Sequence, residues 1–453
     1  MRELNMKTLV LNAAVLIAVL LGSLVVSLPF GRNRQTLFQS ESGGLFVHAA
    51  ERKGARLNVR DFGAKGDGVA DDTAAVQAAI NAASRDTTLV FPRGVYLVSN
   101  FSVKNRTGLT FLGEGRESVI KQKSGAERFA TFERSSEIVI TNLGFDANGI
   151  PSYGGLVFYA VNRVRIEKNW FWDGAPKPIR DADRYSIVFG KGDSPSQNIL
   201  IVDNLIDDLQ LEVNHSKQVV IERNVVNRAV KTAGIGIFTV GDHAVAEDYQ
   251  IINNKIFDPI GAGISVGIDP PTDRNCSFRR ITIANNQIVR SRTAGYGVRI
   301  GTPDNSKRTG GNRFEELQIK NNHIRVDATA PAPAQMIFAN ASATAEILFE
   351  TLTVSGNKLD NEGPRGMEFA VELRRLQNSF IGDNTIKGFA NGIALGGALL
   401  SNQVRNNVVE ATHVAYAMED SLGGNRAVNN QIVGKPKTPW KTSTLKASDL
   451  IER

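Results

Sequence analysis

Short stretches in which apolar and polar residues alternate recur along most of this chain. Clear copies read VVIERNVV (219–226), ITIANNQI (281–288) and LQIKNNHI (317–324). In each copy an aliphatic residue precedes two variable residues, an Asn, one more variable residue and another apolar residue. Alternation with a period of two, in segments rich in Ile and Val, is typical of β-strands and not of helices.

This phrase occurs ten times, with successive Asn residues 20 to 36 positions apart. The Asn residues are Asn169, Asn204, Asn224, Asn254, Asn286, Asn322, Asn357, Asn384, Asn407 and Asn430. A repeat of this length with short strands indicates a solenoid. Successive coils of a parallel β-helix stack at about 4.8 Å, the strand spacing, so that each Asn amide bonds to the next. We therefore predict an all-β chain, a right-handed parallel β-helix of about ten coils.

A second set of strands lies between the Asn phrases, as in GAGISVGID (261–269) and NGIALGG (391–397). Within each strand, alternate residues point to opposite faces. The alternation predicts one outward-facing file of residues along the solenoid. Its members are Val188, Gln210, Phe238, Ser265, Arg299 and Ala394.

Residues 57–98 read as strand, Gly-rich turn, helix and strand. Asp71 or Asp72 can cap a helix that begins at Thr73, and Ala and Ile residues give this helix an apolar face. The first coil of a solenoid needs a cover, because it would otherwise expose core and strand edges. We predict that the short N-terminal helix caps the β-helix.

The apolar run from Leu9 to Leu28 is close to the length that spans a bilayer, and Arg2 and Lys7 precede it. No small-x-small cleavage site follows directly, which favours a signal anchor over a cleaved signal peptide for residues 1–34. The protein is then exported, either anchored and facing outside or secreted. Residues 35–56 are predicted to be a polar tether, 57–434 the β-helix domain, and 435–453 a C-terminal tail.

The formal net charge of +7 suits an anionic partner such as an acidic polysaccharide. The sequence lacks the basic runs interleaved with aromatic residues that are typical of nucleic-acid binding, so no nucleic-acid partner is predicted. Cys276 is the only cysteine, which excludes an intrachain disulfide. The five His residues show no metal-ligand spacing, and no metal site is predicted.

The segment 57–98, with its AKGDGVADDT string, resembles the entry motif of the pectate-lyase-like β-helix superfamily. That superfamily includes family 28 glycoside hydrolases, mannuronan epimerases and phage tailspikes. The resemblance covers residues 57–433 and implies the fold more strongly than the reaction. Gly267-Ile268-Asp269-Pro270-Pro271 is similar to an epimerase signature, but the Tyr and His that are catalytic there are replaced by Val266 and Pro271.

Polygalacturonases of family 28 carry Asn-Thr-Asp, Asp-Asp, Gly-His-Gly and Arg-Ile-Lys on successive coils. The corresponding segments here are Asp183-Arg184-Tyr185, Asp207-Asp208, Gly234-Ile235-Gly236 and Arg299-Ile300-Gly301. The resemblance therefore implies catalytic roles for Asp207 and Asp208 and substrate binding by Arg299. At three positions an Asp, a His and a Lys of the family are absent, which leaves a degenerate motif.

Further polar residues follow the strands of the second set and are expected near one corner on successive coils. We predict Asp242 as a third catalytic carboxylate. Groups one coil apart, at about 5 Å, suit a retaining pair or a shared metal, whereas groups two coils apart, at about 9.6 Å, lie near the upper end of the inverting separation. The predicted substrate-binding residues besides Arg299 are Asp269, Asp304, His243, Trp172 and Tyr185. Each Asp also has a simpler interpretation as a turn residue.

The leading hypothesis is an exported protein that cleaves glycosidic bonds of an acidic polysaccharide by acid/base hydrolysis, without a cofactor. The first alternative is a polysaccharide lyase that acts by β-elimination, in which Ca²⁺ could bridge the Asp residues. The second is a non-catalytic glycan-binding or cell-surface structural β-helix. Membrane contact is predicted only through the N-terminal segment.

Overall fold

The computed structural model describes residues 37–39, 45–47, 54–150, 155–174, 184–268, 273–301, 311–333, 335–340 and 349–452. The chain divides into two units, residues 1–51 and 52–453. In the first unit, β1 (Leu37–Gln39) pairs antiparallel with β2 (Leu45–Val47). The run Leu9–Leu28 lies outside the described residues. Among the helices that the structure describes, none is long and apolar enough to cross a membrane.

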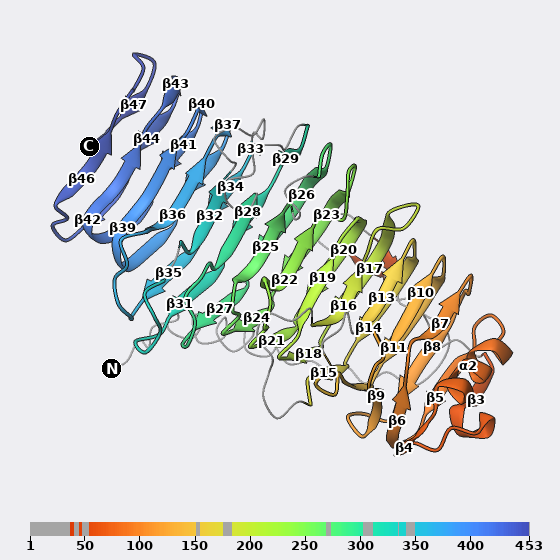
Figure 1. The fold of residues 1–453 in the computed structure, drawn as a ribbon. Coiled ribbons are helices and arrows are strands. Elements are labelled where there is room, and N and C mark those ends of the chain that lie inside the picture. The colour runs from red at the N-terminus through yellow and green to blue at the C-terminus, as the bar shows by residue number, and fades with distance from the viewer. Residues whose placement is uncertain are drawn as a thin grey trace, which may run out of the picture. The chain divides into compact units, whose positions relative to one another are not determined.

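The second unit is a stack of coils in which parallel strands form three sheets (Figure 1). The chain passes from sheet A to sheet C, then to sheet B and back to sheet A. The strands of sheet A are β7 (Phe101–Lys104), β10 (Ala130–Glu133), β13 (Leu156–Tyr159), β16 (Tyr185–Phe189), β19 (Gln210–Val213), β22 (Ala233–Phe238), β25 (Ala262–Gly267), β28 (Val298–Gly301), β32 (Ile337–Asn340), β36 (Phe369–Arg374), β39 (Thr385–Gly396), β42 (Val408–Met418) and β46 (Thr438–Thr442).

Sheet B shares the long strands β39 and β42 with sheet A. Its other strands are β4 (Asp67–Asp71), β6 (Gly94–Val98), β9 (Ser118–Gln122), β12 (Gly144–Asp146), β15 (Trp170–Trp172), β18 (Leu205–Asp207), β21 (Val225–Asn227), β24 (Lys255–Phe257), β27 (Gln287–Arg290), β31 (His323–Val326), β35 (Lys358–Asn361) and β45 (Gln431–Val433).

Sheet C begins with the first strand of the second unit. Its strands are β3 (Arg56–Asn58), β5 (Thr88–Phe91), β8 (Thr110–Gly113), β11 (Ser136–Thr141), β14 (Asn162–Glu167), β17 (Ser196–Val202), β20 (Ser216–Glu222), β23 (Val245–Ile252), β26 (Ser277–Ala284), β29 (Arg313–Glu315), β30 (Gln318–Lys320), β33 (Phe349–Glu350), β34 (Thr353–Ser355), β37 (Leu376–Gln377), β38 (Phe380–Gly382), β40 (Leu399–Leu400), β41 (Gln403–Arg405), β43 (Ser421–Gly423), β44 (Arg426–Val428) and β47 (Leu450–Ile451).

The ten Asn residues of the repeat lie at the turn from sheet C to sheet B and form one continuous ladder. Each side-chain nitrogen donates to the Oδ1 atom of the next Asn, at 2.8 to 3.2 Å in all nine steps from Asn169 to Asn430. All except Asn430 are buried. Because every buried amide is satisfied within the stack, the ladder sets the register of the coils.

The stack is longer than the predicted ten coils, since sheet A has thirteen strands within the described residues. The additional coils precede Asn169 in the sequence. In the coil directly before Asn169, Leu143 takes the ladder position. Its backbone N–H donates to Asn169 Oδ1 at 3.1 Å and so ends the ladder. In sheet A of the early coils, the rings of Phe132 and Phe158 stack at 4.6 Å, and that of Phe189 follows at 4.5 Å.

The predicted helix is present as α2 (Thr73–Ala82), and it begins at the expected residue. Its buried side chains are Val76, Ala79 and Ile80, and they belong to the hydrophobic core. Asp71 Oδ1 accepts the Thr73 backbone N–H at 3.0 Å. The helix therefore packs its apolar face on the first coils. A 3-10 helix, η1 (Val59–Phe62), lies beside it.

The outward file of sheet A differs from the prediction at two of its six positions. Its consecutive members from β16 to β28 are Val188, Glu212, Gly236, Ser265 and Arg299. Glu212 and Gly236 therefore take the places expected for Gln210 and Phe238. Alternation identifies the outward residues of one strand, but it does not determine which of them stack across coils.

Candidate functional site

Three polar side chains, two on β19 and one directly after it, form a row on the outward face of sheet A. Gln210 Nε2 donates to Glu212 Oε2 at 2.7 Å, and Asn214 Nδ2 donates to Glu212 Oε1 at 2.6 Å. The backbone N–H groups of Ala233 and Phe238, in the next coil, donate to the two amide oxygens. These bonds fix the amide orientation, so both amide nitrogens point to the carboxylate. Glu212 is only 9% exposed, and the two amides hold its carboxyl group in place on this face.

Tyr185 and Lys231 lie beside this row. A β-bulge between Tyr185 and Ile187 lets Tyr185 pair with Gln210, which places its side chain on the outward face. The Lys231 ammonium bonds to the Tyr185 hydroxyl and lies 4.7 Å from the ring centroid. Tyr185 is 4% exposed. A phenol and an ammonium group in direct contact form a pair that can hold and transfer a proton.

Arg299 lies further along the same face. Its Nε donates to Ser265 Oγ at 3.2 Å, and its guanidinium carbon is 5.8 Å from the centroid of the Tyr296 ring. The Tyr296 ring stacks on Phe338 at 5.2 Å. A planar guanidinium beside an aromatic pair suits a ligand that carries both a carboxylate and an apolar ring face.

Arg290 holds the loop that carries Tyr296. It is fully buried and donates to backbone oxygens of Pro259, Gly261, Ala294 and Tyr296. Burial lowers the pKa of Arg290 to about 10, and the group remains charged at neutral pH. Its role is to position the loop.

The predicted catalytic pair Asp207 and Asp208 lies elsewhere, at the corner between sheets B and A. Asp207 ends β18, and its oxygens accept Trp170 Nε1 at 2.9 Å and Asn227 Nδ2 at 2.7 Å. Asp208 forms two bonds to Arg228, at 2.8 and 3.0 Å. Its φ of 62° bends the chain before β19 starts. The sequence led us to expect these two carboxylates on the outward face with Arg299, but the structure does not gather them there.

Asp242 and His243 lie at the corner from sheet A to sheet C and are exposed. Asp242 Oδ1 accepts the Arg274 backbone N–H at 2.8 Å, and the His243 N–H donates to the Arg274 carbonyl. These are contacts of a turn between successive coils. Asp269 and Asp304 lie outside the described residues.

Trp172 lies on the outward face of sheet B. Its ring stacks on Trp170 at 4.2 Å, and the Arg116 guanidinium lies 4.5 Å from the Trp170 ring. Trp172 thus belongs to a separate aromatic patch on sheet B. Asp207 lies beside this patch, because it accepts the hydrogen bond from Trp170. Among the predicted residues, Tyr185 and Arg299 share the outward face of sheet A.

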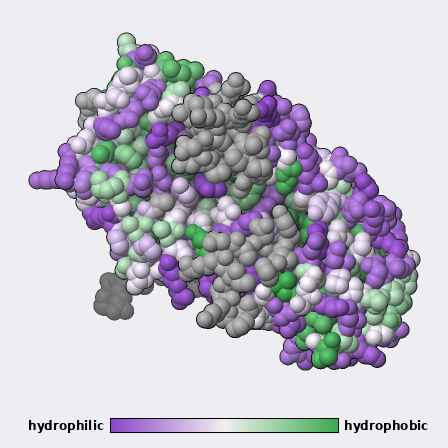
Figure 2. All heavy atoms as spheres, viewed as in Figure 1, coloured by the Kyte–Doolittle hydropathy of each residue, from purple (hydrophilic) through white to green (hydrophobic). Residues whose placement is uncertain are grey.

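Within the part of the chain that the structure describes, no group of three or more His, Cys, Asp and Glu side chains is arranged to hold a metal ion. The surface in Figure 2 mixes hydrophilic and hydrophobic residues, with hydrophilic ones predominant. The exposed large apolar side chains in the described ranges are Val69, Met367, Leu422, Val433 and Leu450.

The sequence analysis did not identify Glu212 or Lys231 as site residues, nor the hydrogen bond from the Gln210 amide to Glu212. The available signal for Glu212 was its outward position in the LQLEV strand. Lys231 precedes β22 in a connection without regular pattern, and its contact with Tyr185 bridges 46 positions of sequence.

Comparison with known proteins agrees with this fold. Residues 56–169 match the family model described as Rhamnogalacturonase A/epimerase, pectate lyase-like. Mannuronan C5-epimerase AlgE5 of Azotobacter vinelandii is 39% identical over 234 residues, which cover 46% of this chain and 22% of the relative. Alginate lyase 7 of the same organism is 38% identical over 108 residues, covering 20% and 12%. The chain spans less than a quarter of either relative.

A solved structure, the family 28 exopolygalacturonase of Yersinia enterocolitica, superimposes with a TM-score of 0.56 at 14% identity, covering 90% of this chain and 82% of that one. This likeness shows the fold alone. The chain therefore folds as a parallel β-helix, and its residues 56–169, which include the N-terminal helix, are similar to the pectate-lyase-like family model, in agreement with the resemblance inferred from the entry motif. These three proteins are named as polysaccharide-acting enzymes.

Proposed function

We propose that this protein is an enzyme that acts on an anionic polysaccharide along the outward face of sheet A. The contact between Tyr185 and Lys231 carries this proposal, with Glu212 beside it and Arg299 further along the same face. The cationic groups suit a chain of uronate sugars. The relatives named for mannuronan and alginate support the same substrate class.

The reaction that this arrangement supports best is β-elimination. An ammonium group beside a phenol favours the deprotonated phenolate, which can accept the proton next to a uronate carboxylate. Lys231 also lies where it can pair with that carboxylate and stabilise the negative charge that develops on it. Loss of the proton and cleavage of the bond to the leaving glycosidic oxygen form a carbon–carbon double bond. The proton then returns to the leaving oxygen.

Hydrolysis, the hypothesis from sequence, requires two carboxyl groups on either side of the scissile bond. Asp207 and Asp208 are engaged by Trp170, Asn227 and Arg228 at the sheet corner. The Glu212 carboxylate is likewise engaged, by the side-chain amides of Gln210 and Asn214. This favours proton abstraction over hydrolysis at this site.

The test is incubation of the full chain with a panel of uronate polysaccharides while absorbance of unsaturated products and new reducing ends are both recorded. We expect both signals together, and their loss in Tyr185→Phe. Tyr159→Phe, a change on β13 of the same sheet, is the matched control and should retain activity. New reducing ends without absorbance would identify a hydrolase. Tight binding without either product across the panel would identify a glycan-binding protein.

A further inference from the structure

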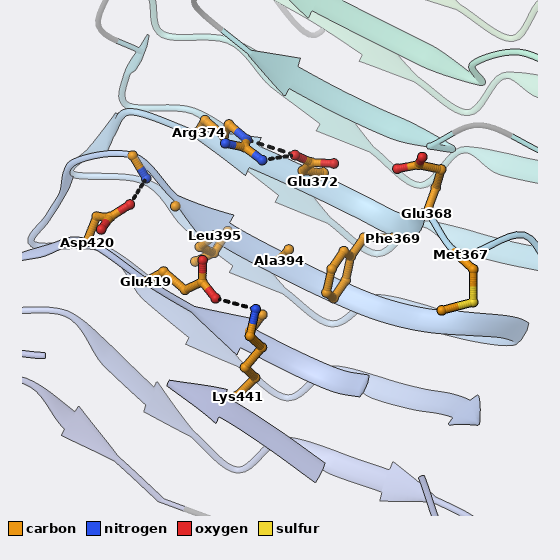
Figure 3. Close-up of a pocket in the computed structure, with 13 residues that line it drawn as sticks. Met367, Glu368, Phe369, Glu372, Arg374, Ala394, Leu395, Glu419, Asp420 and Lys441 are labelled. Atoms are coloured by element: carbon orange, nitrogen blue, oxygen red, sulfur yellow. Dashed lines mark hydrogen bonds and ion pairs between the residues drawn. The ribbon is translucent and has the colours of Figure 1, made fainter. Parts of the chain in front are cut away.

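A second feature of sheet A is a cavity of about 280 Å³ toward the C-terminal coils, over β36, β39, β42 and β46 (Figure 3). Two of its residues, Ala394 and Ala417, belong to the outward file that contains Arg299. Gly396 and Gly397 add to this floor of small residues. The absence of larger side chains at these four positions leaves room for a ligand.

The lining of the cavity carries more negative than positive charge. The carboxylates are Glu368, Glu372, Glu419 and Asp420, and the cations are Arg374 and Lys441. Both cations are already paired within the cavity. Arg374 Nε lies 2.7 Å from Glu372 Oε1, and Lys441 Nζ lies 2.8 Å from Glu419 Oε1, as Figure 3 shows. Glu368 and Asp420 are the excess anions.

Glu372 is the buried anchor of this cavity, with 9% of its surface exposed. Gln335 Nε2 donates to Glu372 Oε2 at 2.8 Å and to Glu368 Oε2 at 3.1 Å. One amide therefore holds two carboxylates close together. An additional anion would be repelled here, whereas hydroxyl or ammonium donors would be attracted.

An apolar surface lies at one end of the cavity. Figure 3 shows Phe369 and Met367 on the side of Glu368. Met367 is 66% exposed, and Phe369 is partly exposed. A ring and a thioether beside carboxylates form a surface with both apolar and acceptor groups, which matches a sugar with an apolar face and several donors.

We propose that this cavity binds a sugar without a carboxylate, either neutral or an amino sugar, of the same polysaccharide chain. This inference rests on the proposed function and specifies its substrate class. Arg299 and Glu372 are separated by two coils, about 9.6 Å at the strand spacing. A single oligosaccharide can therefore contact both. The substrate is then a heteropolysaccharide in which uronate residues are interspersed with non-anionic sugars.

The experiment is calorimetric binding of the full chain to three oligosaccharides of equal length. They are an oligogalacturonate, a hyaluronan fragment with N-acetylglucosamine, and a de-N-acetylated heparosan fragment with free glucosamine. We expect at least one mixed oligosaccharide to bind about tenfold more tightly than the oligogalacturonate, as one charge-assisted hydrogen bond would give. Tighter binding of the glucosamine form identifies an amino-sugar site, and tighter binding of the acetylated form identifies a neutral one.

Two variants place this preference in the cavity. Ala394→Trp fills the floor and should abolish the preference, while Thr131→Trp, earlier in the same outward file, should leave it unchanged. Glu368→Gln should weaken binding of the glucosamine form about tenfold. Equal affinity for all three oligosaccharides, or a preference that survives Ala394→Trp, would overturn the proposal. If no polysaccharide is cleaved but the preference is present and lost in Ala394→Trp, the proposed reaction is wrong and the cavity assignment stands.

Discussion

The Lys231 ammonium bonds to the Tyr185 hydroxyl from two coils further along the stack, and it lies 4.7 Å from the centroid of the Tyr185 ring. Replacing Lys231 by Met keeps a long unbranched side chain, one heavy atom shorter, and removes the charge. Because this charge stabilises the phenolate, we expect kcat to fall about 100-fold or more. The measurement is the initial rate of formation of the unsaturated product.

Lys217→Met is the matched control for that variant. Lys217 lies on sheet C and pairs at the surface with Glu247 at 3.1 Å, so its loss should cost at most about 1 kcal/mol of stability and leave the rate unchanged. Full turnover by a folded Lys231→Met protein would exclude the pair from the reaction.

A substitution of Asp208 distinguishes β-elimination from hydrolysis. In Asp208→Asn the two bonds to Arg228 weaken, but the pair is at the surface, with the Arg228 side chain half exposed. We expect a loss of stability of at most about 1 kcal/mol and activity within about threefold of the parent protein. Activity assays and urea denaturation check both. A loss of several orders of magnitude in rate, with the fold intact, would restore the hydrolase hypothesis.

The Asn ladder predicts a strong dependence of stability on position. Asn254 bonds to Asn224 and Asn286 and donates to the Ile221 carbonyl at 2.8 Å. Asn254→Ala leaves several buried groups without partners, and we expect the free energy of unfolding to fall by about 3 kcal/mol. Asn430→Ala, at the half-buried end of the ladder, should cost about 1 kcal/mol. Urea denaturation measures both, and equal losses would contradict a cooperative internal ladder.

His215 makes stability depend on pH. It is 7% exposed, and its Nδ1 accepts the Val245 N–H at 3.3 Å. Burial, helped by the Lys191 and Lys217 ammonium groups, lowers the pKa of His215 below the 6.5 of the unfolded chain. The unfolded state therefore binds a proton first as pH falls, so this contribution to stability is present above about pH 6.5 and is lost progressively below it.

We expect His215→Gln to flatten the dependence of unfolding free energy on pH between about 5 and 7. The measurement is urea denaturation at a series of pH values. His413→Gln, a change at a partly exposed residue, is the control and should leave the slope as it is in the parent protein. An unchanged slope in His215→Gln would show that another group is responsible.

The sequence predicted the fold well because each coil repeats one physical requirement. A buried Asn amide needs partners above and below, and only a stack at the strand spacing supplies them at ten positions. The number of coils was underestimated for the same reason: Leu143 takes the ladder position, and the coils before Asn169, although they lie within the predicted β-helix domain, have no repeated Asn to count.

The candidate site was harder to predict, because it depends on where the chain bends. Asp207 and Asp208 precede an outward-facing strand in the sequence, but the left-handed conformation of Asp208 leaves them at the corner before it. Glu212 follows four residues after Asp208 and lies on the outward face. Contacts across coils, such as that of Lys231 with Tyr185, depend on the lengths of irregular connections, which no periodicity encodes.

The Asn ladder makes the spacing of the coils independent of the length of the connections around them. Between successive ladder residues the chain length varies from 20 to 36 residues, yet the amide–amide distance stays within 2.8 to 3.2 Å. Connections around the coils can therefore lengthen, shorten or be exchanged without moving the strands that present the site. Because the strand positions stay fixed while single connections change, new glycan specificities can evolve, or be engineered, one connection at a time.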